Sequence, residues 1–128
     1  FKNLTLYKVR VYKIFLNHII FIDKDKLDAT ITVRKKIEGD YFYPVGMFGK
    51  KKVSKYFKDQ KLSLIDKEKT LILCSHDKIV WVVSHRLDDR FKVSKETKHI
   101  LKITYQSLVA LTGLTIAFER LWSFVHNI

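Results

Sequence analysis

The chain has 128 residues, a hydrophobic content of 47% and a formal net charge of +12 at pH 7. This length suits one domain whose core is large enough to fold unaided, and the hydrophobic content argues against a disordered chain. The only cysteine, Cys74, lies in the apolar run TLILC, so an intrachain disulfide is excluded and a buried thiol is expected.

The positive charge is concentrated in one part of the chain. Residues 34–61 contain nine basic and three acidic side chains, so these 28 residues carry a surplus of six, which is half of the total. Such a cluster indicates a polyanionic partner, because basic residues that neutralise phosphates release condensed counterions. The alternative is a chain that is generally rich in lysine and has no such partner.

The first predicted elements are strands. Residues 4–14 alternate apolar and basic side chains in places, and residues 18–23 form a second apolar run, HIIFID. A turn over 23–28 leads to a third strand at 29–34, where β-branched side chains favour a pleated sheet. Residues 38–50 contain three of the four glycines and the only proline, which predicts a structured loop.

A short helix is predicted after this loop. The apolar side chains of VSKYF, residues 53–57, are spaced i, i+3 and i+4 and form one helical face. Lys51, Lys55 and Lys58 lie on another face, where their mutual repulsion is unfavourable by only tenths of a kcal/mol. We interpret this lysine row as an anion-binding face; the alternative is an ordinary solvated face.

Two continuous apolar runs follow, TLILC at 70–74 and IVWVV at 79–83, with a short turn between them. Such runs predict a hairpin that is buried on both faces. Ser94 is expected to cap a helical turn at 95–99, and a strand follows at 100–103. Together these elements predict an α+β fold, a small and mostly antiparallel β-sandwich-like domain with two short helices.

The sequence contains no motif for a self-contained active site. Its glycines lie at 39, 46, 49 and 113, a spacing that fits neither the dinucleotide-binding motif nor the P-loop. One cysteine and five scattered histidines do not supply the closely paired ligands that zinc needs. We therefore predict no catalytic residue, no metal site and no cofactor in this chain.

Charged residues at alternate positions follow the second apolar run. Asp88 and Asp89 are adjacent, so in a strand they point to opposite faces and cannot act together on one bond. Arg86 and Arg90 lie two residues before and after Asp88. This spacing predicts a ladder of ion pairs on one face rather than the rim of an active site.

The chain contains the segments FIDKDKL, TVRKKIEGDYFYPVGMFGKKKVSKYFKD and LILCSHDKIVWVVSHRLDDRFKVSKETKHIL. Together they resemble the C-terminal part of the tRNA(Ile)-lysidine synthase family, over residues 21–103. The chain departs from the family pattern at two glycine positions, now His76 and Ser84; if either needs positive φ, the change costs about 1 kcal/mol. The positions expected to build the structural motif are Gly39, Asp40, Pro44, Gly46, Gly49, Trp81, Asp88 and Phe91.

The resemblance implies that this chain holds RNA and leaves the chemistry to another domain. In this ligase family an N-terminal domain with an SGGxDS loop uses ATP, with magnesium, to join lysine to an anticodon cytidine of isoleucine tRNA. No SGGxDS occurs here. The implied partner is tRNA, the implied location is the cytoplasm, and packing against the N-terminal domain is a further expectation. The residues expected to contact RNA are Arg34, Lys35, Lys36, Lys50, Lys51, Lys52, Lys55, Lys58, Arg86, Arg90 and Lys92.

The apolar end of the chain has no counterpart in this resemblance. We divide the chain into an N-terminal strand or linker at 1–20, a lysidine-synthase-like domain at 21–103 and a tail at 104–128. The tail is expected to be helical, and its uncharged stretch, 104–118, is shorter than the roughly 20 residues that a membrane-spanning helix needs. The alternative function is a non-enzymatic interaction or scaffold domain whose tail associates with a partner protein or a membrane.

Overall fold

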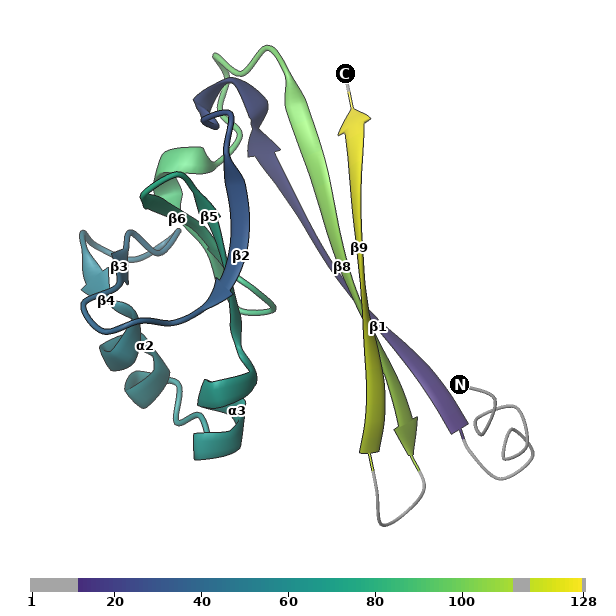
Figure 1. The fold of residues 1–128 in the computed structure, drawn as a ribbon. Coiled ribbons are helices and arrows are strands. Elements are labelled where there is room, and N and C mark those ends of the chain that lie inside the picture. The colour runs from purple at the N-terminus through teal and green to yellow at the C-terminus, as the bar shows by residue number, and fades with distance from the viewer. Residues whose placement is uncertain (1–11, 112–115, 128) are drawn as a thin grey trace.

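The computed structural model describes the backbone of residues 12–111 and 116–127 and the side chains of residues 18–105. A small α+β body lies on one side, and a long three-stranded sheet extends on the other (Figure 1). The predicted fold class is confirmed, because the described strands pair antiparallel and two short α-helices accompany them.

The strands form three sheets, with the orders β1-β8-β9, β2-β5-β6-β7 and β3-β4. The elements are, in chain order, β1 (Tyr12–Asp23), the 3₁₀ helix η1 (Lys24–Lys26), β2 (Ile31–Lys35), β3 (Tyr41–Phe42), β4 (Lys51–Lys52), α2 (Val53–Asp59), α3 (Leu64–Lys69), β5 (Leu71–Ser75), β6 (Lys78–Val82), β7 (Arg86–Leu87), the 3₁₀ helix η2 (Asp89–Phe91), β8 (Ile100–Leu111) and β9 (Ile116–Asn127).

Two clusters of buried side chains lie on the two faces of the four-stranded sheet. The first cluster joins this sheet to β1 and β8, and its members are Ile22, Leu73, Val80, Trp81, Val83, Phe91, Leu101, Ile103 and Tyr105. The second joins it to β3 and α2, and its members are Phe42, Val53, Tyr56, Phe57, Ile72, Cys74, Ile79 and Val82. The four-stranded sheet is therefore the middle of three layers.

The predicted hairpin, β5 and β6, is buried on both faces. Ile72 and Cys74 belong to the second cluster and Leu73 to the first, because successive residues of a strand face opposite sides. His76, in the turn after β5, has φ 53°, and Ser84, after β6, has φ 68°. Both family glycine positions thus adopt the left-handed conformation that favours glycine.

The first predicted helix is confirmed as α2, whereas the second lies at a different place from the one predicted. Residues 95–99 form no helix: the Ser94 hydroxyl accepts a hydrogen bond from the amide of Glu96 and closes only a local turn. The second helix is α3. It begins after Ser63, whose hydroxyl accepts a hydrogen bond from the amide of Asp66, and this S-x-x-D spacing was its sequence signal.

The tail is extended where the structure describes it, so the predicted helix at 104–128 was wrong. β8 pairs with β1 from Ile100 to Leu111 and with β9 over the same residues. Pairing on both edges gives the backbone groups of β8 partners, and this tertiary context overrides the helix propensity of an apolar run. Among the residues that the structure describes, no helix has the length and apolar character to cross a membrane.

The division of the chain into 1–20, 21–103 and 104–128 stays a prediction. β1 and β8 each continue through one of these boundaries, and the strands predicted at 4–14 and 18–23 meet in the single strand β1. Residues 4–11 lie outside the described residues.

Candidate nucleic-acid interface

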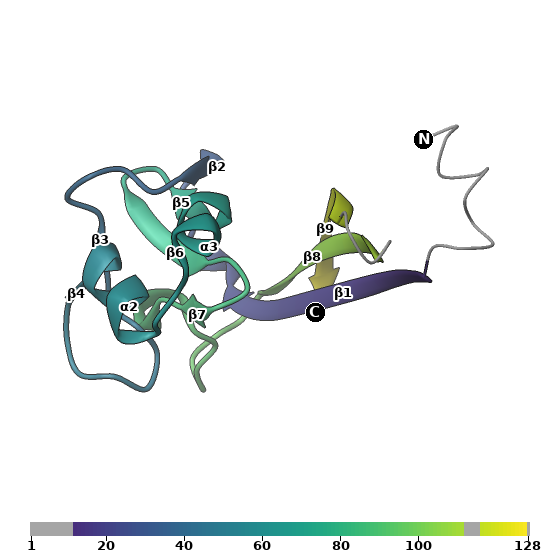
Figure 2. The same ribbon diagram turned by 90° about the horizontal axis from the view of Figure 1, so that it is seen from below.

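The layer made of β3, β4 and α2 lies on the side of the body away from β1, β8 and β9 (Figure 2). Tyr41 pairs with Lys52 and Phe42 with Lys51 across the small sheet. Phe42 is fully buried in the second cluster, whereas Tyr41 is exposed. α2 follows β4 directly and turns its apolar face to the same cluster, so its lysines face outward.

Three lysines on this outer surface form no direct ion pair among the described residues, although the carboxylate of Asp59 attracts Lys55 and Lys58 from a distance. Lys52, Lys55 and Lys58 are exposed and take part in no ion pair among the residues described. Lys51 is different, because its ammonium nitrogen lies 2.5 Å from a carboxylate oxygen of Asp59. The hydrogen bond from Lys51 lowers the pKa of Asp59, so this carboxylate is charged at neutral pH and compensates Lys51.

The loop between β3 and β4 is held against β7. The amide of Val45 donates to the carbonyl of Leu87 at 2.9 Å, and Nη1 of Arg86 donates to the carbonyl of Val45 at 2.8 Å. The amide of Met47 donates to the carbonyl of Pro44 at 3.1 Å and closes a tight turn. Arg86 therefore holds the loop in place.

Asp88 is buried where the loop between β3 and β4 meets β7. Its fully buried carboxylate accepts hydrogen bonds from the amides of Tyr43 and Arg90, and from Nε and Nη2 of Arg90 at 3.0 and 2.9 Å. Burial lowers the pKa of Arg90, but the hydrogen bond to Asp88 together with the charges of Asp88 and the nearby tyrosines outweighs burial, so the pKa is raised. The predicted ladder is half right: Arg90 pairs with Asp88, whereas Arg86 bonds to a backbone carbonyl.

Arg34 is held in a second two-pronged ion pair. Its Nη1 and Nη2 lie 2.8 and 3.0 Å from the two carboxylate oxygens of Asp40, which also accepts a hydrogen bond from the amide of Ile37. Burial raises the pKa of Asp40, but the bonds from Arg34 and Ile37 outweigh it, so the pKa is lowered. The pair joins β2 to the start of β3.

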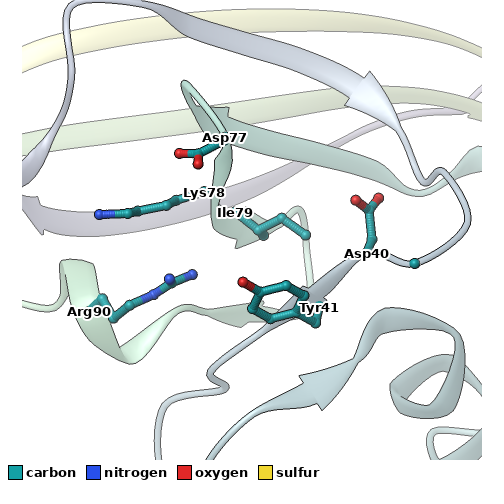
Figure 3. A pocket seen from close by; sticks show the side chains of 7 residues that line it. Asp40, Tyr41, Asp77, Lys78, Ile79 and Arg90 are labelled. Atoms are coloured by element: carbon teal, nitrogen blue, oxygen red, sulfur yellow. The ribbon is translucent and has the colours of Figure 1, made fainter.

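A shallow pocket of about 140 Å³ lies next to this ion pair (Figure 3). Its lining residues are Gly39, Asp40, Tyr41, Asp77, Lys78, Ile79 and Arg90. Nζ of Lys50 lies 4.3 Å from the ring centre of Tyr41, and the guanidinium carbon of Arg90 lies 4.5 Å from that of Tyr43. Because its lining contains two carboxylates, Asp40 and Asp77, and two cations, Lys78 and Arg90, the pocket is not a purely anionic or cationic site. Nowhere in the described part of the chain do three or more His, Cys, Asp or Glu side chains gather in a way that could hold a metal ion.

The residues of the predicted structural motif lie around the place where the loop between β3 and β4 meets β7. The glycines have positive φ, with 89° at Gly39, 78° at Gly46 and 68° at Gly49. The other members are buried or engaged in the contacts above, and these are Asp40, Pro44, Trp81, Asp88 and Phe91.

The residues predicted to contact RNA fall into two groups. The side chains that already have a protein partner are Arg34, Lys51, Arg86, Arg90 and Lys92, the last with Asp89. Those without an ion pair in the described part of the chain are Lys35, Lys36, Lys50, Lys52, Lys55 and Lys58. RNA contact by either group stays a prediction. Sequence reasoning missed two exposed aromatic residues beside the lysines, Tyr41 and Phe48, although the run YFYPVGMFGKKK shows both.

Comparison with known proteins assigns the chain to a family. The family described as "TilS substrate C-terminal domain" matches residues 31–105. The chain is 51% identical over 87 residues to the tRNA(Ile)-lysidine synthase of Parabacteroides distasonis, covering 68% of this chain and 20% of that protein. It is 43% identical over 79 residues to that of Bacteroides thetaiotaomicron, covering 62% and 18%. The chain thus spans about a fifth of the length of these curated relatives.

A solved structure supports the same assignment at the level of the fold. It is described as "Crystal structure of TILS C-terminal domain" and superposes with a TM-score of 0.58 at 18% identity, covering 75% of this chain and 81% of that one. At this identity the likeness shows the fold alone. With a matched region that extends from β2 into β8 and includes the whole second cluster and all of the first except Ile22, the chain belongs to the TilS substrate C-terminal domain family.

Proposed function

We propose that this chain is the tRNA-binding C-terminal module of a tRNA(Ile)-lysidine synthase and that it acts in the cytoplasm. It holds tRNA by shape and phosphate charge, because side chains cannot read the deep, narrow major groove of A-form RNA. The ATP-dependent attachment of lysine to the anticodon cytidine, with ATP and magnesium, belongs to the part of the synthase that this chain does not span. The relatives' shared name supports the choice of isoleucine tRNA.

The observation that carries this proposal is the surplus of exposed lysines on the outer surface of β4 and α2. Lys52, Lys55 and Lys58 lie on the outer layer without ion pairs among the described residues, and residues 41–58 contain five lysines and no acidic residue. A polyanion would relieve the repulsion between these lysines, and the released counterions would add to the affinity.

The experiment compares two double charge reversals by fluorescence anisotropy with labelled tRNA between about 50 and 200 mM salt. Lys55→Glu/Lys58→Glu is expected to weaken binding at least tenfold and to reduce the salt slope by roughly 0.9 for each phosphate that is no longer neutralised. The control, Lys95→Glu/Lys98→Glu, changes the net charge equally at exposed positions outside this surface. Equal weakening by both variants would show that net charge alone decides, and no weakening by either would refute the surface.

The rival function is a protein-interaction module. The observation that favours it is the outer face of β1, where Ile19 and Phe21 are exposed while Ile20 and Ile22 face the first cluster. The same face would suit the expected packing against the N-terminal part of a synthase. A chain that shows no affinity for tRNA at about 50 mM salt would favour the rival.

A further inference from the structure

Phe48 is an aromatic residue that the domain leaves in solvent. Its relative exposure is 106%, whereas the other large hydrophobic residues of this loop and its flanking strands are much less exposed, with Met47 at 38%, Tyr41 at 43% and Phe42 at 0%. Single exposed apolar residues are common on protein surfaces, so exposure alone is no sign of a site. Two further observations, the geometry of the loop and the charge near the ring, indicate that Phe48 contacts a partner.

The loop presents the ring on a fixed backbone. Gly46 and Gly49, on either side of Phe48, have φ of 78° and 68°, which other residues adopt only at a cost. The bonds from Val45 to Leu87 and from Arg86 to Val45 hold the loop on β7, and the bond from Met47 to Pro44 closes its turn. Because the backbone is already held, only the side-chain torsions of Phe48 lose freedom when the ring binds, and this smaller entropy loss favours affinity.

The charge around the ring restricts the kind of partner. Lys50, Lys51 and Lys52 follow Phe48 closely in the chain, and there is no acidic residue from 41 to 58. A second copy of this chain would bring another net charge of +12 and would be repelled. A flat apolar ring that is followed in the chain by the exposed Lys50 and Lys52 instead matches a ligand that joins flat apolar faces to phosphates, and a nucleic acid has both.

We propose that Phe48 stacks on an exposed nucleobase at the end of an RNA duplex, while the nearby lysines hold the adjoining phosphates. This inference rests on the proposed function and adds a contact that charge alone does not supply. Inside a duplex both faces of each base are covered, so the ring needs either a terminal base pair or an unpaired base beside it. Stacking tolerates any base, because every base has a π-face.

The test uses the full 128-residue chain and two RNA hairpins that share one stem. One ends blunt, and the other carries a short unpaired 3′ extension with 2-aminopurine as its first base. Phe48→Ala is expected to weaken binding of the preferred RNA by roughly 5- to 150-fold and to abolish the quenching of 2-aminopurine. Its salt slope is expected to equal that of the parent chain, because the lysines still neutralise the same phosphates.

Two matched variants separate stacking from simple apolar contact. Phe48→Trp keeps a stacking ring and is expected to bind at least as tightly as the parent chain, whereas Phe48→Leu keeps only apolar area and is expected to behave like Phe48→Ala. Ile65→Ala removes another exposed apolar side chain, in α3, and is expected to leave binding unchanged. Melting temperatures equal to that of the parent chain are expected, because the Phe48 ring is not buried.

Each outcome has one meaning. A weakening confined to the blunt hairpin supports stacking on the terminal pair, and a weakening confined to the extended hairpin supports stacking on an unpaired base. If Phe48→Ala binds both RNAs as tightly as the parent chain and the salt slope is intact, the stacking contact is overturned while the proposed function stands. If the parent chain binds neither RNA, the proposed function itself falls.

Discussion

At the scale of single residues, Asp88 is the charged side chain, among those described, whose removal should cost most. It is fully buried, and it accepts the amide of Tyr43 and the guanidinium of Arg90. Asp88→Ala leaves these donors without an acceptor, so we expect a decrease of about 2–3 kcal/mol in the free energy of unfolding, below the full value for a buried pair because Arg90 reaches solvent. Urea denaturation measures it.

The neighbouring aspartate provides the control for this prediction. Asp89 forms an ion pair with Lys92 in which both side chains are about half exposed. Asp89→Ala should therefore cost less than about 1 kcal/mol. If the two variants were equally stable, burial would not be what makes Asp88 important.

Two left-handed residues should be replaceable by glycine with a gain in stability. His76 and Ser84 have φ of 53° and 68°, where a Cβ atom is unfavourable. We expect His76→Gly and Ser84→Gly each to raise the free energy of unfolding by up to about 1 kcal/mol, measured by thermal denaturation. Ser54→Gly, at an exposed helical position in α2, should lower it by about 0.5 kcal/mol. A decrease in all three variants would contradict this backbone effect.

At the scale of elements, the pair between Arg34 and Asp40 connects β2 to β3 and makes stability depend on pH. Because the pKa of Asp40 is lowered by folding, the pair stabilises the protein fully above the unfolded pKa of about 3.9. The stabilisation disappears as the pH falls through the lower folded value. Asp40→Asn should therefore be less stable than the parent chain at pH 7, and the difference should vanish in strong acid.

Asp59 tests whether this acid dependence is specific to the Arg34 pair. Its pKa is lowered in the same direction by Lys51, but the carboxylate is exposed. Urea denaturation of Asp40→Asn and Asp59→Asn from pH 7 to pH 2 should show the larger change for Asp40→Asn. A larger effect at Asp59 would mean that Asp40 does not dominate.

The elements that could be predicted from the sequence are those whose side-chain period is set by a buried face. α2 and the hairpin of β5 and β6 have such periods, because each packs on one or two clusters. The tail had an apolar run with no decisive period, and only pairing with β1 shows that it is extended. α3 has no buried residue, so its signal was the Ser63 cap and not its hydrophobic pattern.

The basic surface could be predicted as a segment but not residue by residue. Lys51 and Lys55 look equivalent in the sequence, yet Asp59 neutralises Lys51 and leaves Lys55 without an ion pair among the described residues. Likewise Arg86 and Arg90 are equally spaced from Asp88, and only the folded loop shows that Arg86 bonds to Val45. Partners far apart in the chain decide which charges are available.

At the scale of the whole molecule, the three layers separate stability from the proposed binding. The clusters lie on the two faces of the middle sheet, while Lys52, Lys55 and Lys58 lie on the outside of the outer layer. Changes to these lysines should therefore alter the affinity for RNA without unfolding the domain. Charge reversal at this surface therefore tests binding alone, because the stability of the domain and its affinity for RNA can be measured independently.

This arrangement predicts that the isolated chain discriminates poorly among tRNAs. Contacts to phosphates position a protein on RNA but carry no direct sequence information, and A-form helices of different sequence share one shape. We expect isoleucine tRNA and an unrelated tRNA to compete for the chain with affinities within about threefold, and with the same salt slope. A duplex DNA of equal length, as the control for shape, should bind more weakly. A preference for isoleucine tRNA above tenfold would mean that this domain reads bases, and the candidate residues would then be those next to the pocket of Asp40, Tyr41 and Arg90.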